Sequence, residues 1–158
     1  MKTVGGIGGS VFEMMQDSVG FTEMCMLMMD DPELYEELYQ TLGDILVKSW
    51  ELLIKKYDDA FCVYRMSDDL GFKTGTLISP DDIKKYVVPH YKRVSDLIHS
   101  YNKPFVLHSC GCIFDVMDEI IDVAKIDARH SNEDAIAPFS EWVNRYGDRT
   151  GLFNAKLY

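Results

Sequence analysis

Apolar residues recur along the chain at helical spacing in some segments and in short buried runs in others. The segment 21–29 is almost entirely apolar and rich in methionine, which predicts a buried helix, because methionine fills irregular gaps in protein cores. A flexible binding surface is the alternative. Asp30-Asp31-Pro32-Glu33 then predicts a helix start, with an aspartate cap and proline in the first turn. The apolar positions of this second, long amphipathic helix are Leu34, Leu38, Leu42, Ile45, Leu46 and Leu53.

After residue 59, predicted strands and helices alternate. The strands are expected at 60–66, 103–108, 124–128 and 149–153, and helices at 80–98, 113–123 and 138–146. Ser79 is expected to cap the first of these helices and Pro89 to kink it. Alternation with short loops predicts parallel strands joined by right-handed crossovers. A doubly wound sheet and part of a TIM (β/α)₈ barrel both fit, and the lack of a glycine-rich phosphate loop after the strand at 60–66 favours the α/β barrel.

Composition narrows the class of protein. The 158 residues amount to a single domain, 1–158, and the 47% of hydrophobic residues excludes a disordered chain. Twenty-six acidic against sixteen basic residues give a net charge of −10, which argues against nucleic acid or a membrane surface as a partner. Four cysteines without a leader segment predict a reduced, cytoplasmic chain; they are Cys25, Cys62, Cys110 and Cys112.

Three of the predicted strand ends carry polar clusters. These are Ser67-Asp68-Asp69, His108-Ser109-Cys110-Gly111-Cys112 and His130-Ser131-Asn132-Glu133-Asp134. Reactive groups of a barrel sit at the C-terminal ends of its strands, so the three clusters are expected on one rim.

His108 and Cys110 are the candidate metal ligands. Two residues apart on an extended segment, their side chains project to the same side, and imidazole with thiolate is a ligand set that zinc prefers. A buried cysteine beside a hydrogen-bonded histidine is the alternative interpretation. His130, Glu133 and Cys112 are candidates for a third ligand, although Cys112 also reads as an uncharged buried thiol.

Asp68 and Asp69 are the candidate catalytic residues. Because they are adjacent, one can bind substrate while the other caps a helix or is solvated. A fully solvated loop is the alternative.

Four segments, in this order and spacing, resemble the uroporphyrinogen decarboxylase superfamily. They are MSDDLG at 66–71, LISPDD at 77–82, VPHYKR at 88–93 and VLHSCG at 106–111. The likeness runs from about 21 to 153 and implies an incomplete TIM barrel, truncated at one or both ends. The superfamily contains metal-free decarboxylases, and zinc-dependent methyltransferases that move methyl groups between corrinoid proteins and thiols such as coenzyme M.

The resemblance implies a choice between these branches. The arginine-bearing segment that the decarboxylases carry near the N-terminus has no counterpart here, whereas His108 and Cys110 match two of the three zinc ligands of the methyltransferases. The third, a downstream cysteine, would lie past Tyr158, so zinc is expected in the full-length protein and weakly or not at all in these 158 residues. The family segment that usually follows the strand at 151–153 is replaced by Asn154-Ala155-Lys156-Leu157-Tyr158, which is interpreted as truncation, an artificial end or divergence.

The first expected function is therefore zinc-dependent methyl transfer from a methyl-corrinoid, carried by a partner protein, to a small thiol. The second is decarboxylation of a tetrapyrrole in porphyrin biosynthesis. The third is an inactive fragment that forms a homodimer, because half a barrel exposes two sheet edges.

Overall fold

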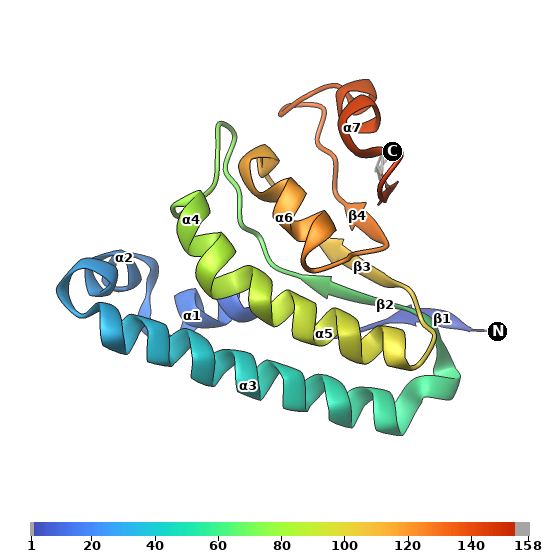
Figure 1. The fold of residues 1–158 in the computed structure, drawn as a ribbon, viewed down its shortest axis with the longest axis horizontal. Coiled ribbons are helices and arrows are strands. Elements are labelled where there is room, and N and C mark those ends of the chain that lie inside the picture. Colours follow the sequence, from blue (N-terminus) through green and yellow to red (C-terminus); the bar gives the residue numbers. More distant parts are fainter. Residues whose placement is uncertain (1, 154–158) are drawn as a thin grey trace.

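The computed structural model describes residues 2–153. Its centre is one parallel sheet in which every strand pairs with its successor along the chain, in the order β1-β2-β3-β4-β5 (Figure 1). The strands are β1 (Thr3–Gly5), β2 (Phe61–Ser67), β3 (Phe105–His108), β4 (Ala128–His130) and β5 (Gly151–Leu152). Sequential order without a reversal point is the order of a (β/α)₈ barrel and excludes the doubly wound sheet.

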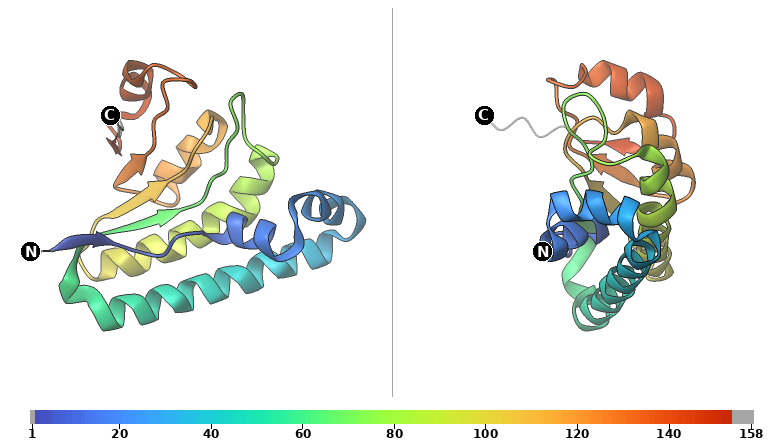
Figure 2. Two further views of the ribbon diagram at one scale, coloured as in Figure 1. Left: turned by 180° about the vertical axis from the view of Figure 1, so that it is seen from behind. Right: turned by 90° about the vertical axis from the view of Figure 1, so that its left-hand side faces the viewer.

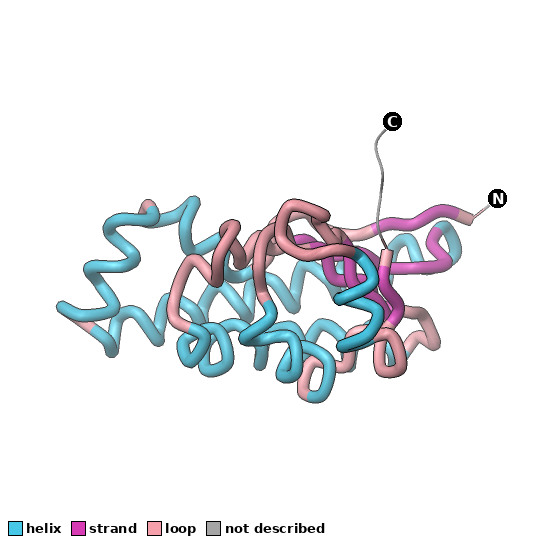
Figure 3. Tube along the Cα trace, turned by 90° about the horizontal axis from the view of Figure 1, so that it is seen from above, coloured by secondary structure: helices cyan, strands magenta, loops and turns pink. Residues whose placement is uncertain are grey.

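Helices cover the outer face of this sheet. The long helices α3 and α5 run side by side along it, with α6 next to them (Figures 1 and 2). The α-helices are α1 (Val11–Val19), α2 (Phe21–Asp30), α3 (Pro32–Tyr57), α4 (Pro80–Asp82), α5 (Val88–Ser100), α6 (Met117–Asp122) and α7 (Phe139–Tyr146). Short 3₁₀ turns lie at Asp58–Ala60 and Phe114–Val116. Seen from above, the strands lie together toward one end of the molecule, and helices extend well beyond them toward the other end (Figure 3).

Among residues 2–153 the sheet is open, since β1 and β5 each pair with a single neighbour. The alternating units therefore confirm the prediction of consecutive β/α units of an incomplete barrel. The segment 154–158, which is expected to depart from the family pattern, lies outside the described residues.

The N-terminal β/α unit was missed by the sequence analysis. Thr3–Gly5 pairs in parallel with β2, and Val11–Val19 forms a helix whose Val11, Phe12 and Met15 are buried. A strand of three residues is too short to show an alternating pattern of apolar and polar positions. The glycines that follow it are typical of a loop rather than of a strand.

Two predictions about the first helices need correction. In α2 only Met24 is fully buried, while Met26 and Met29 are 58% and 80% exposed, so the prediction that core packing explains this methionine-rich helix is largely wrong. In α3 the buried face is turned by one residue from the predicted one: Leu34 and Ile45 are exposed. Aromatic residues determine this rotation, because Tyr35, Tyr39 and Trp50 bury more apolar surface than the leucines beside them. The buried residues of α3 are Tyr35, Tyr39, Gly43, Leu46, Trp50 and Ile54.

The helix predicted from Pro80 is present, and Ser79 caps it. The Ser79 hydroxyl accepts from the backbone N–H groups of Asp81 and Asp82 at 3.2 and 3.4 Å. The segment Ile83–Val87 is wound as a π-helix, after which α5 begins with Pro89 in its first turn. The missing N–H of Pro89 is thus accommodated by a wider turn just before it.

The third predicted strand was placed four residues too early. The strand is Ala128–His130, not 124–128, and Ala124 and Ile126 are buried in the turn before it. Helix 113–123 is shorter than predicted and begins with a 3₁₀ turn, yet its predicted apolar face is buried at every position; these are Ile113, Val116, Met117, Ile120 and Ile121. The short strand β5 lies within the predicted 149–153.

All four cysteines are free thiols. Among the described residues, no helix is both long enough and apolar enough to cross a lipid bilayer.

Candidate metal centre

The C-terminal ends of β2, β3 and β4 form a row in which Ser67 pairs with His108 and His108 pairs with His130. Paired residues of neighbouring strands project to the same face, so these three side chains point to the inner side of the sheet. The expected meeting of the polar clusters on one rim is confirmed.

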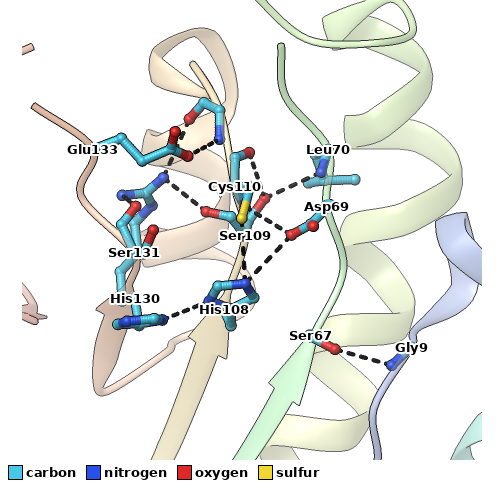
Figure 4. A network of polar contacts seen from close by, with 12 residues as sticks. Gly9, Ser67, Asp69, Leu70, His108, Ser109, Cys110, His130, Ser131 and Glu133 are labelled. Carbon is cyan, nitrogen blue, oxygen red and sulfur yellow. Dashed lines mark hydrogen bonds and ion pairs between the residues drawn. The ribbon is translucent and has the colours of Figure 1, made fainter. Parts of the chain in front are cut away.

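Three side chains on this rim bring nitrogen, sulfur and oxygen donors together. Donor atoms of Asp69, His108 and Cys110 all lie within 4.8 Å of one another. His108 Nε2 is 3.4 Å from Cys110 Sγ and 3.5 Å from Asp69 Oδ1 (Figure 4). Asp69 is also held in place, because its Oδ1 accepts from the Cys110 backbone N–H at 2.8 Å.

Burial shifts the pKa values of His108 and Cys110 in this cluster. Burial, and next the charge of Arg65, lowers the pKa of His108, so its imidazole is neutral at pH 7 and free to donate a lone pair. Burial, and next the Asp69 carboxylate, raises the pKa of the Cys110 thiol to about 11. Without a compensating positive charge, the thiol therefore keeps its proton at neutral pH.

His130 lies against the far side of the His108 ring. The two Nδ1 atoms are 2.5 Å apart, and the rings are stacked with centroids separated by 4.7 Å. Burial and then Arg65 lower the pKa of His130 as well. Two neutral imidazoles make this contact only when one Nδ1 carries a hydrogen and the other accepts it.

The structure separates the two candidate catalytic aspartates. Asp68 is fully buried, and its carboxyl oxygens accept from the backbone N–H groups of Phe12 and Glu13 at 3.1 and 2.8 Å, and from the Tyr91 hydroxyl at 2.7 Å. Burial raises its pKa to about 7. Because Ser10 makes no side-chain cap, Asp68 takes over that task and fixes the start of α1 to the end of β2.

Arg129 braces the loops that carry the cluster, a role that sequence analysis missed. Its guanidinium donates to the Ser131 carbonyl at 2.8 Å and to the Ser109 carbonyl at 3.2 Å, and it lies 4.1 Å from the Trp142 ring centroid. Burial lowers the pKa of Arg129 to about 10, which leaves it charged at neutral pH. Arg129 lies in the middle of a strand of three residues. In so short a strand, the sequence pattern does not distinguish a buried arginine from an exposed one.

The candidate third ligands have other contacts. Glu133 accepts from the Gly111 backbone N–H at 2.8 Å, and so ties the loop after β4 to the loop after β3 (Figure 4). The Cys112 backbone N–H donates to the Phe72 carbonyl at 2.6 Å. The cluster of three donors includes none of His130, Glu133 and Cys112; its oxygen donor is Asp69.

Close backbone packing explains the glycines at positions 71 and 111, in the loops after β2 and β3. A Cβ on Gly71 would lie 2.8 Å from the Cys112 backbone nitrogen, and Gly111 has a φ of +78°. Only glycine allows both the close approach and the left-handed conformation.

One family model matches nearly the whole described chain: the model described as "Uroporphyrinogen decarboxylase (URO-D)" matches residues 2–152. No curated protein matches this sequence.

Proposed function

The chain belongs to the uroporphyrinogen decarboxylase family, whose members share the TIM-barrel fold and are generally enzymes, and on that premise we propose that it acts in zinc-dependent methyl transfer to a thiol. The observation that carries the proposal is the cluster of Asp69, His108 and Cys110. Decarboxylases of this family work without a metal, so they have no need of such a donor set.

The donor spacing fits zinc. With zinc–nitrogen and zinc–sulfur bonds of about 2.1 and 2.3 Å in a tetrahedron, neighbouring donors are expected about 3.6 Å apart. The distances from His108 Nε2 to Cys110 Sγ and to Asp69 Oδ1, 3.4 and 3.5 Å, are close to this value. Three protein ligands with a fourth position left for substrate are typical of catalytic zinc sites.

A bound zinc ion would supply the positive charge that holds a substrate thiol as thiolate at neutral pH. The sulfur would then form a bond to the methyl carbon of a methyl-corrinoid substrate, and the electron pair of the broken carbon–cobalt bond would stay on cobalt. In this scheme the thiol proton is lost to solvent before transfer.

The protein's own residues prepare the site. His108 Nε2 is available as a ligand when its Nδ1–H donates to His130, and the side chain of Asp69, 44% exposed, leaves the centre open to substrate. Arg129 and Glu133 hold the loops after β3 and β4 in position, so the donors need little rearrangement on binding.

Elemental analysis after dialysis against a weak chelator tests the proposal. We expect about one zinc per wild-type chain, a loss of zinc in Cys110→Ser and Asp69→Ala, and retention in Cys112→Ser, which is the matched control. Cobalt(II) substitution adds a spectroscopic check, since a tetrahedral site with a thiolate ligand absorbs in the visible and near-ultraviolet.

A wild-type chain that retains no metal would contradict the proposal, as would a loss confined to Cys112→Ser. Either result would favour the metal-free decarboxylase chemistry of the family.

A further inference from the structure

Helix α3 carries a second apolar face beside the aromatic face that is buried in the core. Its residues are three, four or seven positions apart and so lie along one side of the helix; this leucine face consists of Leu34, Leu38, Leu42, Ile45 and Leu52. Leu38 and Leu42 are half-buried. Leu34, Ile45 and Leu52 are 41%, 48% and 71% exposed. Much of the leucine face is therefore open to solvent.

The leucine face lies on the flank of α3 that points away from α5. Asp44 marks the opposite flank, since its carboxylate pairs with Arg93 of α5 at 2.7 Å. Because successive residues of a helix are rotated by about 100°, Ile45 and the rest of the leucine face turn away from that contact. α3 forms the lower border of the molecule in Figure 1, with α5 above it. A partner helix can therefore approach the leucine face from outside.

Charge is unevenly distributed along α3. Its first two turns contain only acidic charges and its last ten residues contain all its lysines; the residues are Glu33, Glu36 and Glu37, and then Lys48, Lys55 and Lys56. The two other acidic residues, Asp44 and Glu51, are seven positions apart and share the flank next to α5. Beside the leucine face, α3 is thus negative toward its N-terminal end and positive toward its C-terminal end.

Glu37 and Lys48 border the leucine face on either side of its middle. Glu37 is three positions after Leu34, and both are exposed. Lys48 is three positions after Ile45 and is exposed as well. In an antiparallel pair of α3 helices, Glu37 lies opposite Lys48 of the second copy, twice by symmetry, whereas a parallel pair brings like charges together. The partial charges of the helix ends favour the antiparallel pair too.

The apolar residues fit the same antiparallel arrangement. A two-fold axis near position 43 places Leu34 opposite Leu52 of the second copy, and Leu42 opposite Ile45. The row from 34 to 52 extends over about 27 Å at 1.5 Å per residue, so the contact covers most of the helix. We propose that two copies of this chain associate through the leucine faces of their α3 helices, packed antiparallel about this axis.

This surface is separate from the metal centre and from the sheet edges. The metal centre lies at the strand ends on the inner side of the sheet, whereas α3 belongs to the helices on its outer face, so the inference does not depend on the proposed function. The unpaired edges of β1 and β5 are not part of it either. An interface made mainly of one helix pair is at the low end of specific interfaces, about 1,200 Å² or less, so we expect a dissociation constant on the order of 10 µM.

Sedimentation equilibrium of the chain from about 5 to about 500 µM, which spans this dissociation constant, tests the inference. We expect a monomer–dimer equilibrium in wild type. Leu52→Glu and Ile45→Glu should each weaken the dimer by at least about tenfold, because association would bury an unpaired charge. Both positions are exposed in the single chain, so the fold should be kept, which circular dichroism checks. Val143→Glu, at a similarly exposed valine of α7, is the matched control and should leave the association unchanged.

Charge reversal tests the antiparallel arrangement. Glu37→Lys and Lys48→Glu should each weaken the dimer by about fivefold, because like charges then face each other. The double variant Glu37→Lys/Lys48→Glu has the net charge of wild type and should recover its affinity, since opposite charges face each other again. In a parallel pair, the double variant would recover nothing.

A wild-type chain that stays monomeric at about 500 µM would overturn the inference. A dimer that persists in both Leu52→Glu and Ile45→Glu would also reject it, because such a dimer must use another surface, for example the sheet edges. If these two variants abolish the dimer but the charge-reversed double variant does not recover the affinity lost in its single variants, the antiparallel arrangement is wrong.

Discussion

His108 and His130 face each other across β3 and β4, with their Nδ1 atoms 2.5 Å apart, so the side of His108 opposite to the metal centre is occupied by a second imidazole. A ligand histidine is oriented by the partner of its other ring nitrogen, and removing such a partner typically costs 10–100-fold in metal affinity. We therefore expect His130→Ala to weaken zinc binding by about 10-fold or more.

A chelator competition titration measures this effect, and His130→Asn, which keeps an acceptor, should recover part of the affinity. Zinc affinity unchanged in His130→Ala would show that His108 is oriented by other contacts. Circular dichroism of both variants controls for folding.

The cap at Ser79 gives a test of the helix that follows β2. Ser79 Oγ accepts from two backbone N–H groups that have no partner within the helix, and Ser79→Ala is expected to cost about 1 kcal/mol of unfolding free energy. Urea unfolding measures it, with Ser79→Asp as the control that keeps a capping oxygen. An unchanged free energy of unfolding in Ser79→Ala would mean that water replaces the hydrogen bonds of the cap.

Helices α3 and α5 cross where Gly43 meets His90. A Cβ on Gly43 would lie 2.0 Å from His90 Nδ1, so Gly43→Ala should destabilise the fold by about 1–3 kcal/mol. A loss of stability would identify the steric contact with His90, because by helix propensity alone alanine is favoured over glycine by about 1 kcal/mol.

Thermal or urea unfolding measures this change, with Thr41→Ala on the exposed side of α3 as the control. The double variant Gly43→Ala/His90→Ala should lose less stability than the sum of the single variants, since the contact is then relieved. If the stability losses of the two single variants add up in the double variant, the contact between residues 43 and 90 is not the cause of the destabilisation.

The buried ring of His90 makes stability depend on pH. Burial, and next the charge of Arg93, lowers the pKa of His90 below its usual 6.5, while Asp44 acts in the opposite direction. The unfolded chain therefore takes up a proton near pH 6.5 that the folded chain refuses. The stabilisation is present above that pH and is lost as the pH falls, by at most about 1.4 kcal/mol per pH unit.

Urea unfolding of metal-free protein at pH 7.5 and 5.5 tests this dependence. His108 and His130 contribute in the same direction, so the relevant quantity is the difference between wild type and His90→Gln. The variant should lose less stability on acidification. Equal losses would show that His90 becomes protonated in the folded chain.

Local sequence determined most of the elements after residue 20, and their order. Ser79-Pro80 specifies a helix start through the cap and the fixed φ of proline, and the apolar spacing from Ile113 to Ile121 specifies which face is buried. Both act within a few residues, so no tertiary contact is needed to recognise them. The rim position of His108 and His130 follows in the same way, because parallel strands end on one side.

The tertiary structure decided which side chains meet. Asp68 and Asp69 are neighbours in sequence, yet one is buried beneath α1 and the other faces His108, because the chain turns at the end of β2. The same holds for β1 and Arg129, whose roles arise from strand pairing and loop contacts between segments far apart in the chain. Residue types and local spacing therefore specified most of the helices and strands, while β1, the third donor and the helix cap by Asp68 required long-range packing, which no local pattern encodes.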